Sequence, residues 1–493
     1  MIKKLTSLLF VFLFLFSLLG VFSNSTLGNT TSFIKTTINS NLDIQFNDFS
    51  EEHFGDQFLF WLNIPELVQM RGTLLAVGNW SYIYMANDTV ELLGQNASVD
   101  KCNQIRDVFD EAIYPKALEI AGSPDGNLGD IDGDPHVTIF LAPLVRNYGD
   151  NSVLGYYDNK DDDPANPYSN LREMFYVDSE KSVSDTINII IHEFNHMIWY
   201  NYELDEAQFL TEGLANYAID YSGYYSWVTD AVTDSFTQHP EISLLYFNRE
   251  YGSLWDASYG QAYLFVTYLV ERFGNEFTKK LVSMSEDGAL AVELALTSEG
   301  YDLTFNDLYL DWITACVIDD TGCYDGIYGF DTVDYRILKK TGIGYYLPIE
   351  KNNIVHYYYG FEVKEINAPN DNFTFIIDNP HPYALGISIA IKDNNGWNVT
   401  QIINTKRSDK IALYCEGEDI QESYVITSLM TEQTPPDYGQ VYSLEDVESV
   451  NLSYEFLEGY IEIDEGSFST LIVFSTILFV SGTLVILRRR RKN

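Results

Sequence analysis

Two histidines four residues apart are the clearest chemical signal in the chain. They belong to the segment His192-Glu193-Phe194-Asn195-His196, and the chain has only 7 histidines in all. On a helix, residues i and i+4 lie on the same face, so both imidazoles can bind one metal ion. Glu193 would lie at the edge of that face, within reach of a water on the metal. The alternative interpretation is a pair of histidines packed in a core without a metal.

A catalytic zinc site needs a third protein ligand and an open fourth position for water. The extended motif with a third histidine six residues after His196 is excluded here. Trp199 occupies the position where that motif requires Gly, and Tyr202 occupies the position of the third histidine. The third ligand is therefore expected to be a carboxylate further along the chain.

Glu212 is the best candidate for that carboxylate. It lies in the segment Thr211-Glu212-Gly213-Leu214-Ala215-Asn216-Tyr217. Asn216, four residues later, would share its helical face and could support the ligand. Glu203 and Glu206 are the rival carboxylates, in a polar stretch that we expect to be solvated.

These residues require two helices and a sheet to position them. Ser184 is a predicted N-cap, with Asp185 in the first turn, for a helix that runs to about residue 200. A second helix is predicted at about 211–220. By hydrophobic periodicity, further helices are predicted at 101–121, 259–273, 276–284 and 305–317, and strands at 58–61, 72–77, 80–85, 137–141 and 174–177. We expect the strand at 174–177 to be a sheet edge that receives an extended peptide.

Three alternating aspartates suggest a second cation site. Asp130, Asp132 and Asp134 are spaced as in a calcium loop, but the full EF-hand pattern fails at Pro135 and Leu141. A looser structural Ca²⁺ site at the three aspartates is one interpretation. An acidic turn that leads into a strand is the other.

The zinc motifs resemble those of a known family. His-Glu-x-x-His followed by a Glu-Gly-Leu-Ala-x-Tyr-type helix is similar to the gluzincins, the thermolysin-like zinc metallopeptidases, and most similar to their secreted hyicolysin-type branch. The resemblance covers roughly residues 100–320. Further segments support it in the right order, namely 109–115, 130–134, 137–139, 155–157, 174–178, 259–265 and 311–312.

This resemblance implies a zincin-like fold and a mechanism of peptide hydrolysis. Zn²⁺ on His192, His196 and Glu212 would lower the pKa of a water to roughly 7 and polarise the scissile carbonyl. Glu193 would take the proton of that water and pass it to the leaving amine. Tyr259, which opens a predicted helix in a family-like segment, is our candidate for stabilising the oxyanion. The alternative for Tyr259 is a plain core tyrosine.

The charge of the chain excludes one class of partner. Asp and Glu number 72 against 29 Lys and Arg, which gives a formal net charge of −43. A protein with this negative charge repels the phosphate backbone of nucleic acids, so nucleic acid is not a predicted partner. With 46% hydrophobic residues the chain is too apolar for a disordered acidic protein.

The sequences at both ends of the chain predict that the part between them is extracellular. Residues 1–24 are a predicted signal peptide, with an uncleaved anchor as the alternative, and 25–50 form a Ser/Thr/Asn-rich linker. Residues 468–487 carry no charge and are long enough, as a helix, to cross a hydrocarbon core of ~30 Å. The basic tail at 488–493 would stay cytoplasmic by the positive-inside rule. The lipid bilayer is thus a predicted partner through one helix, and glycosylation sequons agree, at Asn24, Asn29, Asn79, Asn87, Asn96, Asn372, Asn398 and Asn451.

The predicted fold class is α+β, with three parts. A zincin-like metallopeptidase domain covers 51–345, with a leading β segment at 51–100. An all-β sandwich domain follows at 350–463, because seven short strand-like runs alternate there with turn residues. A single C-terminal transmembrane helix completes the predicted fold.

The predicted function is a membrane-anchored cell-surface zinc metallopeptidase. It would hydrolyse peptide bonds in extracellular proteins, as an endopeptidase, with Glu193 as general base. Proteins or peptides outside the cell are the predicted substrates. The rival hypothesis is an adhesion or envelope surface protein in which the zinc site is secondary or inactive.

Overall fold

The protein forms two compact units. The computed structural model describes residues 51–459, apart from short gaps at 65, 149–152, 225–226, 250–251, 334–344, 368–371, 406–408, 417–418, 437–438 and 442, and residues 470–474. The first unit lies within residues 1–114 and 128–197, and the second within 115–127 and 198–493. The predicted signal peptide at 1–24, the linker at 25–50 and the basic tail at 488–493 lie outside the described residues.

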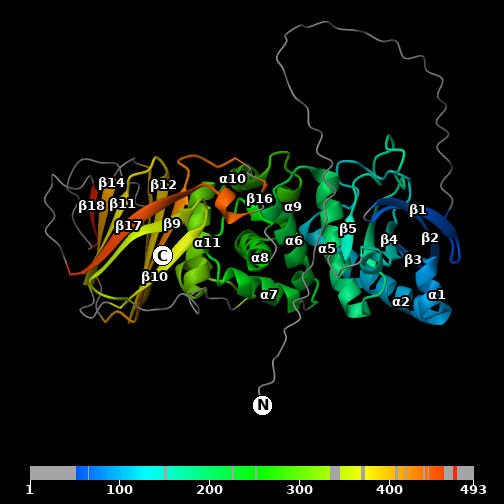
Figure 1. The fold of residues 1–493 in the computed structure, drawn as a ribbon, viewed down its shortest axis with the longest axis horizontal. Coiled ribbons are helices and arrows are strands. Elements are labelled where there is room, and N and C mark those ends of the chain that lie inside the picture. The colour runs from blue at the N-terminus through cyan, green and yellow to red at the C-terminus, as the bar shows by residue number, and fades with distance from the viewer. Residues whose placement is uncertain are drawn as a thin grey trace, which may run out of the picture. The chain divides into compact units, whose positions relative to one another are not determined.

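A mixed sheet is the basis of the first unit (Figure 1). Among the described residues its strand order is β1-β2-β3-β4-β6-β5. The central strands β3, β4 and β6 are parallel, whereas β1, β2 and β5 pair antiparallel with their neighbours. The strands are β1 (Gln57–Ile64), β2 (Glu66–Val77), β3 (Ser81–Ala86), β4 (Val137–Ala142), β5 (Gly155–Tyr157) and β6 (Met174–Asp178).

Both faces of the central strands are buried. On one face of the sheet, the rings of Phe60 and Phe140 stack with centroids 4.4 Å apart, and Tyr84 meets Phe60 edge-on at 5.0 Å. On the other face, Ile139 and Phe175 are completely shielded from solvent. Burial on two faces explains why these strands are nearly continuous apolar runs.

Helices cover the sheet of the first unit. They are α1 (Asn87–Leu93), α2 (Gln95–Val108), a π-helical turn η1 (Phe109–Ile113), α4 (Leu144–Tyr148) and α5 (Val183–Tyr202). The end of α5 and all of α3 (Tyr114–Ile120) except Tyr114 are assigned to the second unit. Helix α5 packs through Phe194, whose ring centroid lies 5.0 Å from that of Phe109 and 6.2 Å from that of Phe175. The cap of α5 is Ser182 rather than the predicted Ser184, because Ser182 Oγ accepts a hydrogen bond from Asp185 N at 3.1 Å.

The edge of this sheet differs from our prediction. Strand β6, which we expected at the edge, lies between β4 and β5, so that prediction is wrong. The outermost strand on this side is β5. At 3 residues β5 is too short to produce a strand pattern in the sequence.

Most helices of the second unit follow α5 in the chain. They are α6 (Gln208–Tyr221), α7 (Trp227–Phe236), α8 (Ser253–Phe273), α9 (Asn275–Val282), α10 (Gly288–Ser298) and α11 (Phe305–Ile318), with a 3₁₀ turn η2 (Tyr324–Gly326). Helix α8 is buried over almost all its length, and α6 and α7 pack against it. A capping box at Thr304 and Asp307 starts α11.

Two sandwich-like sheets complete the second unit (Figure 1). In the described part of the chain, one has the order β13-β12-β15-β10-β8 and the other β18-β14-β11-β17-β9. His356 of β9 links the two sheets, because its Nε2 lies 3.0 Å from Thr427 Oγ1 of β15. The strands are β8 (Tyr345–Tyr346), β9 (Ile349–Tyr357), β10 (Phe361–Asn367), β11 (Asn372–Asn379), β12 (Ala384–Asp393), β13 (Gly396–Asn404), β14 (Asp409–Glu416), β15 (Glu422–Met430), β17 (Ser449–Glu458) and β18 (Thr470–Phe474), while β7 (Phe247–Asn248) and β16 (Gln440–Val441) pair separately and η3 (Leu444–Asp446) is a 3₁₀ turn.

The predicted fold class needs correction. The fold is mixed α/β rather than α+β, because the first sheet contains parallel strands between antiparallel ones. The predicted transmembrane helix at 468–487 is wrong: Thr470–Phe474 is strand β18, which pairs in parallel with β14. Within the described ranges, no helix combines the length and the apolar character needed to cross a membrane. An uncharged stretch of this length is typical of a membrane-spanning helix, but the pairing of Thr470–Phe474 with β14 makes this part of it a strand.

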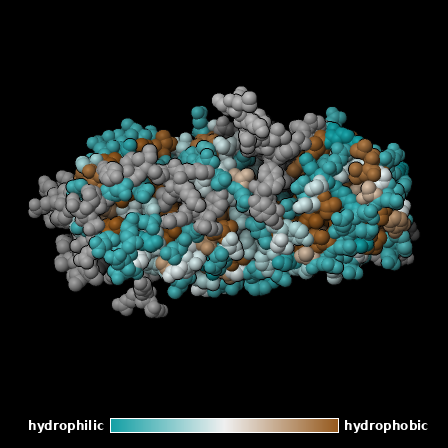
Figure 2. All heavy atoms as spheres, turned by 90° about the horizontal axis from the view of Figure 1, so that it is seen from below, coloured by the Kyte–Doolittle hydropathy of each residue, from teal (hydrophilic) through white to brown (hydrophobic). Residues whose placement is uncertain are grey.

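The described surface agrees with the strongly acidic composition. Figure 2 shows a face that is largely hydrophilic, with separate hydrophobic patches. Large apolar side chains are exposed at scattered positions, such as Phe54 at 60% and Leu92 at 61%. Scattered exposed apolar residues of this kind are normal for a folded protein.

Candidate metal centre

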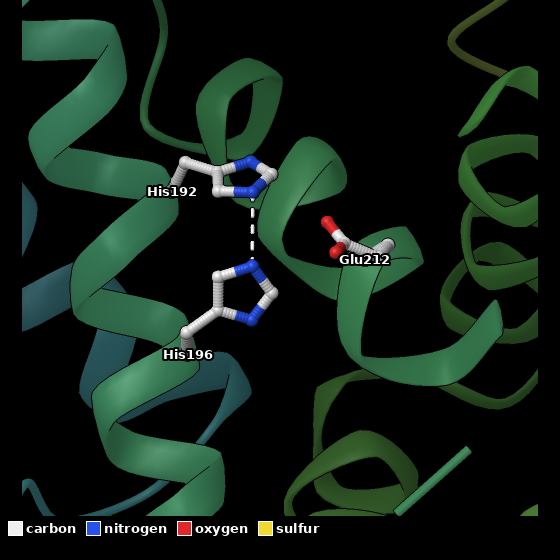
Figure 3. A group of neighbouring side chains, drawn as sticks. All are labelled: His192, His196 and Glu212. Carbon is white, nitrogen blue, oxygen red and sulfur yellow. Dashed lines mark hydrogen bonds between the residues drawn. The ribbon is translucent and has the colours of Figure 1, made fainter. Parts of the chain in front are cut away.

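Helices α5 and α6 present three buried side chains to one another. His192 and His196 come from α5 and Glu212 from α6, and one potential ligand atom of each lies within 4.8 Å of the other two. Figure 3 shows both imidazole rings and the carboxylate pointing toward a common space. The exposed fraction is 2% for each histidine and 0% for Glu212. The predicted ligand set is therefore brought together in space.

The two imidazoles have nearly the separation that a shared zinc ion requires. His192 Nε2 and His196 Nε2 lie 2.9 Å apart. Two nitrogens at 2.0–2.1 Å from one tetrahedral ion would be separated by about 3.3 Å. The observed separation is thus within about 0.4 Å of the value expected for two ligands of one zinc ion.

The chemistry of the donor set also fits a metal. Two neutral imidazoles and one carboxylate are a zinc ligand set that leaves a fourth position open. Burial of the Glu212 carboxylate costs several kcal/mol of desolvation unless a positive charge or hydrogen bonds compensate it. A divalent cation between the three side chains would supply that positive charge.

Close packing of α6 on α8 positions Glu212. The next residue, Gly213, faces α8 so closely that a β-carbon there would stand 2.5 Å from both Ala262 O and Val266 Cγ2. Only glycine permits this approach of two helices. Glu212 is thus a potential metal ligand, and the neighbouring Gly213 allows their helix α6 to pack closely on α8.

The rival carboxylates have structural positions instead. Glu206 is 9% exposed, and its Oε1 accepts hydrogen bonds at 2.6 Å from Ala207 N and from Gly288 N. It therefore ties the start of α6 to the start of α10, and our expectation that it is solvated is wrong. Glu203 Oε1 accepts a hydrogen bond from Asp205 N at 3.4 Å, beyond the end of α5. Neither belongs to the group formed by His192, His196 and Glu212.

Glu193 lies against the edge strand of the first sheet. It is 1% exposed. A β-carbon built on Gly155 of β5 would stand 2.9 Å from Glu193 Oε1 and 2.5 Å from Ile189 Cγ2. The backbone of β5 thus passes Glu193 too closely to leave room for a side chain at position 155. Sequence analysis missed this role of Gly155, since the segment 155–157 was notable only as part of the family resemblance.

Tyr259 is a buried residue of α8. It is 7% exposed, and its ring meets Phe247 edge-on at 5.0 Å and lies 6.5 Å from the ring of Trp255. This packing is compatible with a core tyrosine. Its role in stabilising an oxyanion stays a prediction.

Two comparisons with known proteins bear on this site. No protein-family model and no curated protein matches the chain. The likeness to gluzincins therefore stays a resemblance carried by the motifs, and the functional argument rests on the geometry of the side chains.

Proposed function

We propose that the protein is a zinc-dependent peptidase that hydrolyses internal peptide bonds of proteins. One observation carries the proposal: His192, His196 and Glu212 converge as a buried group of potential metal ligands, next to Glu193 on the same helix. Structural zinc sites use four protein ligands, whereas three ligands with an adjacent carboxylate are typical of hydrolytic sites.

Three residues would hold the metal. His192 and His196 would bind through Nε2, the atoms that face each other, and Glu212 through its carboxylate. A bound zinc ion supplies Lewis acidity, which polarises a carbonyl group and makes water more acidic. The low exposure of all three side chains would exclude competing water and strengthen the electrostatic interactions at the site.

Glu193 would move the proton. Its carboxylate would accept a proton from the attacking water at Oε1 or Oε2 and then donate it to the nitrogen of the leaving amine. The two transfers leave Glu193 ionised again at the end of the cycle. Replacement of a general base of this type typically lowers the rate by 10²–10⁴-fold.

Strand β5 would orient the substrate. It is the last strand on its side of the described sheet, and Gly155 contacts Glu193. An extended peptide that added to this edge by main-chain hydrogen bonds would pass beside the Glu193 carboxylate. Binding through the main chain would suit unfolded or extended segments with little demand on side chains.

The proposal is tested with the purified full chain loaded with zinc. We would compare cleavage of an unfolded protein by wild type, Glu193→Gln and the control Glu203→Gln, and measure the zinc content of each. We expect one zinc per chain in all three proteins and a loss of at least 10²-fold in rate for Glu193→Gln only. Absence of zinc from the wild-type protein, or equal cleavage by Glu193→Gln, would refute the proposal.

A further inference from the structure

A second group of acidic side chains lies at one end of the first sheet. Asp130 and Asp132 belong to the loop before β4, and Glu173 directly precedes β6. One carboxylate oxygen of each lies within 4.8 Å of the other two. The main chain holds the two loops together, because Thr138 N donates to Glu173 O at 2.9 Å and Ile131 N donates to Glu173 Oε1 at 2.7 Å.

A fourth carboxylate, from Asp162, adds an independent observation. Asp162 lies in the loop between β5 and β6 and is 5% exposed. Its Oδ2 accepts a hydrogen bond from Tyr157 OH at 2.5 Å, but its Oδ1 is buried with no hydrogen-bond partner. Burial raises the pKa of Asp162, and the nearby charges of Glu173 and Asp132 raise it further. A bound cation would supply the partner that this buried carboxylate oxygen lacks.

The basic residues next to the group in the chain form their ion pairs with other acids, although the charge of Arg172 also acts on Asp132. Arg172 Nη1 pairs with Glu52 at 3.1 Å, and Lys160 Nζ pairs with Asp158 at 2.5 Å.

We propose that this group is a calcium site formed by Asp130, Asp132 and Glu173, with Asp162 beside them. Oxygen ligands alone are the choice of a hard cation rather than of zinc. Calcium–oxygen distances of 2.3–2.6 Å allow ligands up to about 5 Å apart, which agrees with the observed spread. Magnesium needs a near-ideal octahedron, and carboxylates contributed by two separate loops provide that less readily.

The site differs from the one expected at Asp130, Asp132 and Asp134. Asp134 is engaged elsewhere, because its Oδ1 pairs with His136 Nδ1 and accepts a hydrogen bond from His136 N. Glu173, distant in the sequence, takes its place. A cation here would join the loop before β4 to the loop after β5, and so would hold β5, the strand that contacts Glu193.

The test uses calcium binding by the full chain, kept saturated with zinc so that the two metals are not confused. Calcium and, separately, magnesium are titrated into calcium-depleted protein by calorimetry, and the melting temperature is measured in parallel. The variants are Asp162→Asn and Glu173→Gln. Asp163→Asn is the matched control, because Asp163 is exposed and adjacent to Asp162.

We expect one calcium per chain in wild type and in Asp163→Asn, with a rise in melting temperature of about 5–10 °C at 100-fold excess over Kd. In Asp162→Asn and Glu173→Gln, calcium affinity should fall at least 10-fold, and the increase in melting temperature caused by calcium should be correspondingly smaller. Without calcium, Asp162→Asn should melt no lower than wild type, since it removes a buried repulsion. The proposal is overturned if wild type shows no calcium-dependent shift, if magnesium acts equally, or if both variants respond as wild type does. These readouts do not depend on peptidase activity.

Discussion

The backbone of Gly155 lies so close to Glu193 that no side chain fits between them. A β-carbon at Gly155 would lie 2.9 Å from both Cγ and Oε1 of Glu193, which is closer than atoms in ordinary van der Waals contact. The edge strand and the proposed general base therefore have a fixed relation. Any substrate that pairs with β5 would be aligned with Glu193 by the same contact.

Replacing Gly155 with alanine should displace Glu193. The added methyl group would also meet Ile189 Cγ2 at 2.5 Å, so α5 or β5 must shift. We expect kcat/KM to fall about 10²-fold and stability by about 1–3 kcal/mol, with zinc content unchanged. Tyr156→Phe on the same strand is the control and should retain most activity. Unaltered kcat/KM in Gly155→Ala would separate β5 from the catalytic geometry.

The third ligand can be assigned by comparing two glutamates. Glu212→Gln should lower zinc affinity more than about 100-fold, because it removes the only charged ligand of the proposed site. Glu206→Gln should keep zinc but lower the melting temperature by a few degrees, since Glu206 accepts hydrogen bonds at the starts of α6 and α10. Zinc affinity is measured by competition with a chromogenic chelator. Tight zinc binding by Glu212→Gln would exclude it as a ligand.

The predicted role of Tyr259 is tested by removing its hydroxyl group. If Tyr259 stabilises an oxyanion, Tyr259→Phe should lower kcat by about 10²–10³-fold and leave zinc affinity unchanged. The control is Tyr263→Phe, one turn further along α8, where the hydroxyl donates to Asp220 Oδ2 at 2.5 Å. That control should alter stability rather than kcat. Equal kcat in Tyr259→Phe and wild type would leave Tyr259 as a core residue.

His356 should make the stability of the second unit depend on pH. Burial lowers the pKa of His356 below its usual value of about 6.5. As the pH falls below about 6.5, His356 therefore takes up a proton more readily in the unfolded chain than in the folded one. The free energy of unfolding is highest above pH ~6.5 and decreases as the pH falls through the pKa of His356 in the folded protein.

The measurement for His356 is the melting temperature from pH 5 to 8. We expect wild type to lose stability relative to His356→Gln below pH ~6.5, by at most ~1.4 kcal/mol per pH unit. His53→Gln, at an exposed position, should follow wild type throughout. A constant difference between wild type and His356→Gln over this range would contradict the linkage.

Local sequence patterns were sufficient for the two helices of the candidate site. The helix predicted at 184–200 is α5 (Val183–Tyr202), and the one predicted at 211–220 is α6 (Gln208–Tyr221). Period and composition act within one element, and the spacing of His192 and His196 alone places both imidazoles on one face. The choice of Glu212 over Glu206 also came from its helical setting.

Which distant segments meet could not be predicted from local patterns and became clear from the long-range contacts of the fold. The sequence analysis assigned the sheet edge to 174–177 and a membrane helix to 468–487, whereas β5 is the edge and part of the second run is β18. Similarly, Glu173 rather than Asp134 completes the acidic group. The sequence of a short apolar or acidic segment does not predict which other segment it contacts, because strand pairing and loop contacts depend on which surfaces the rest of the fold brings together. The sequence by itself thus determined the chemistry that each helix carries, and long-range packing determined what lies against it.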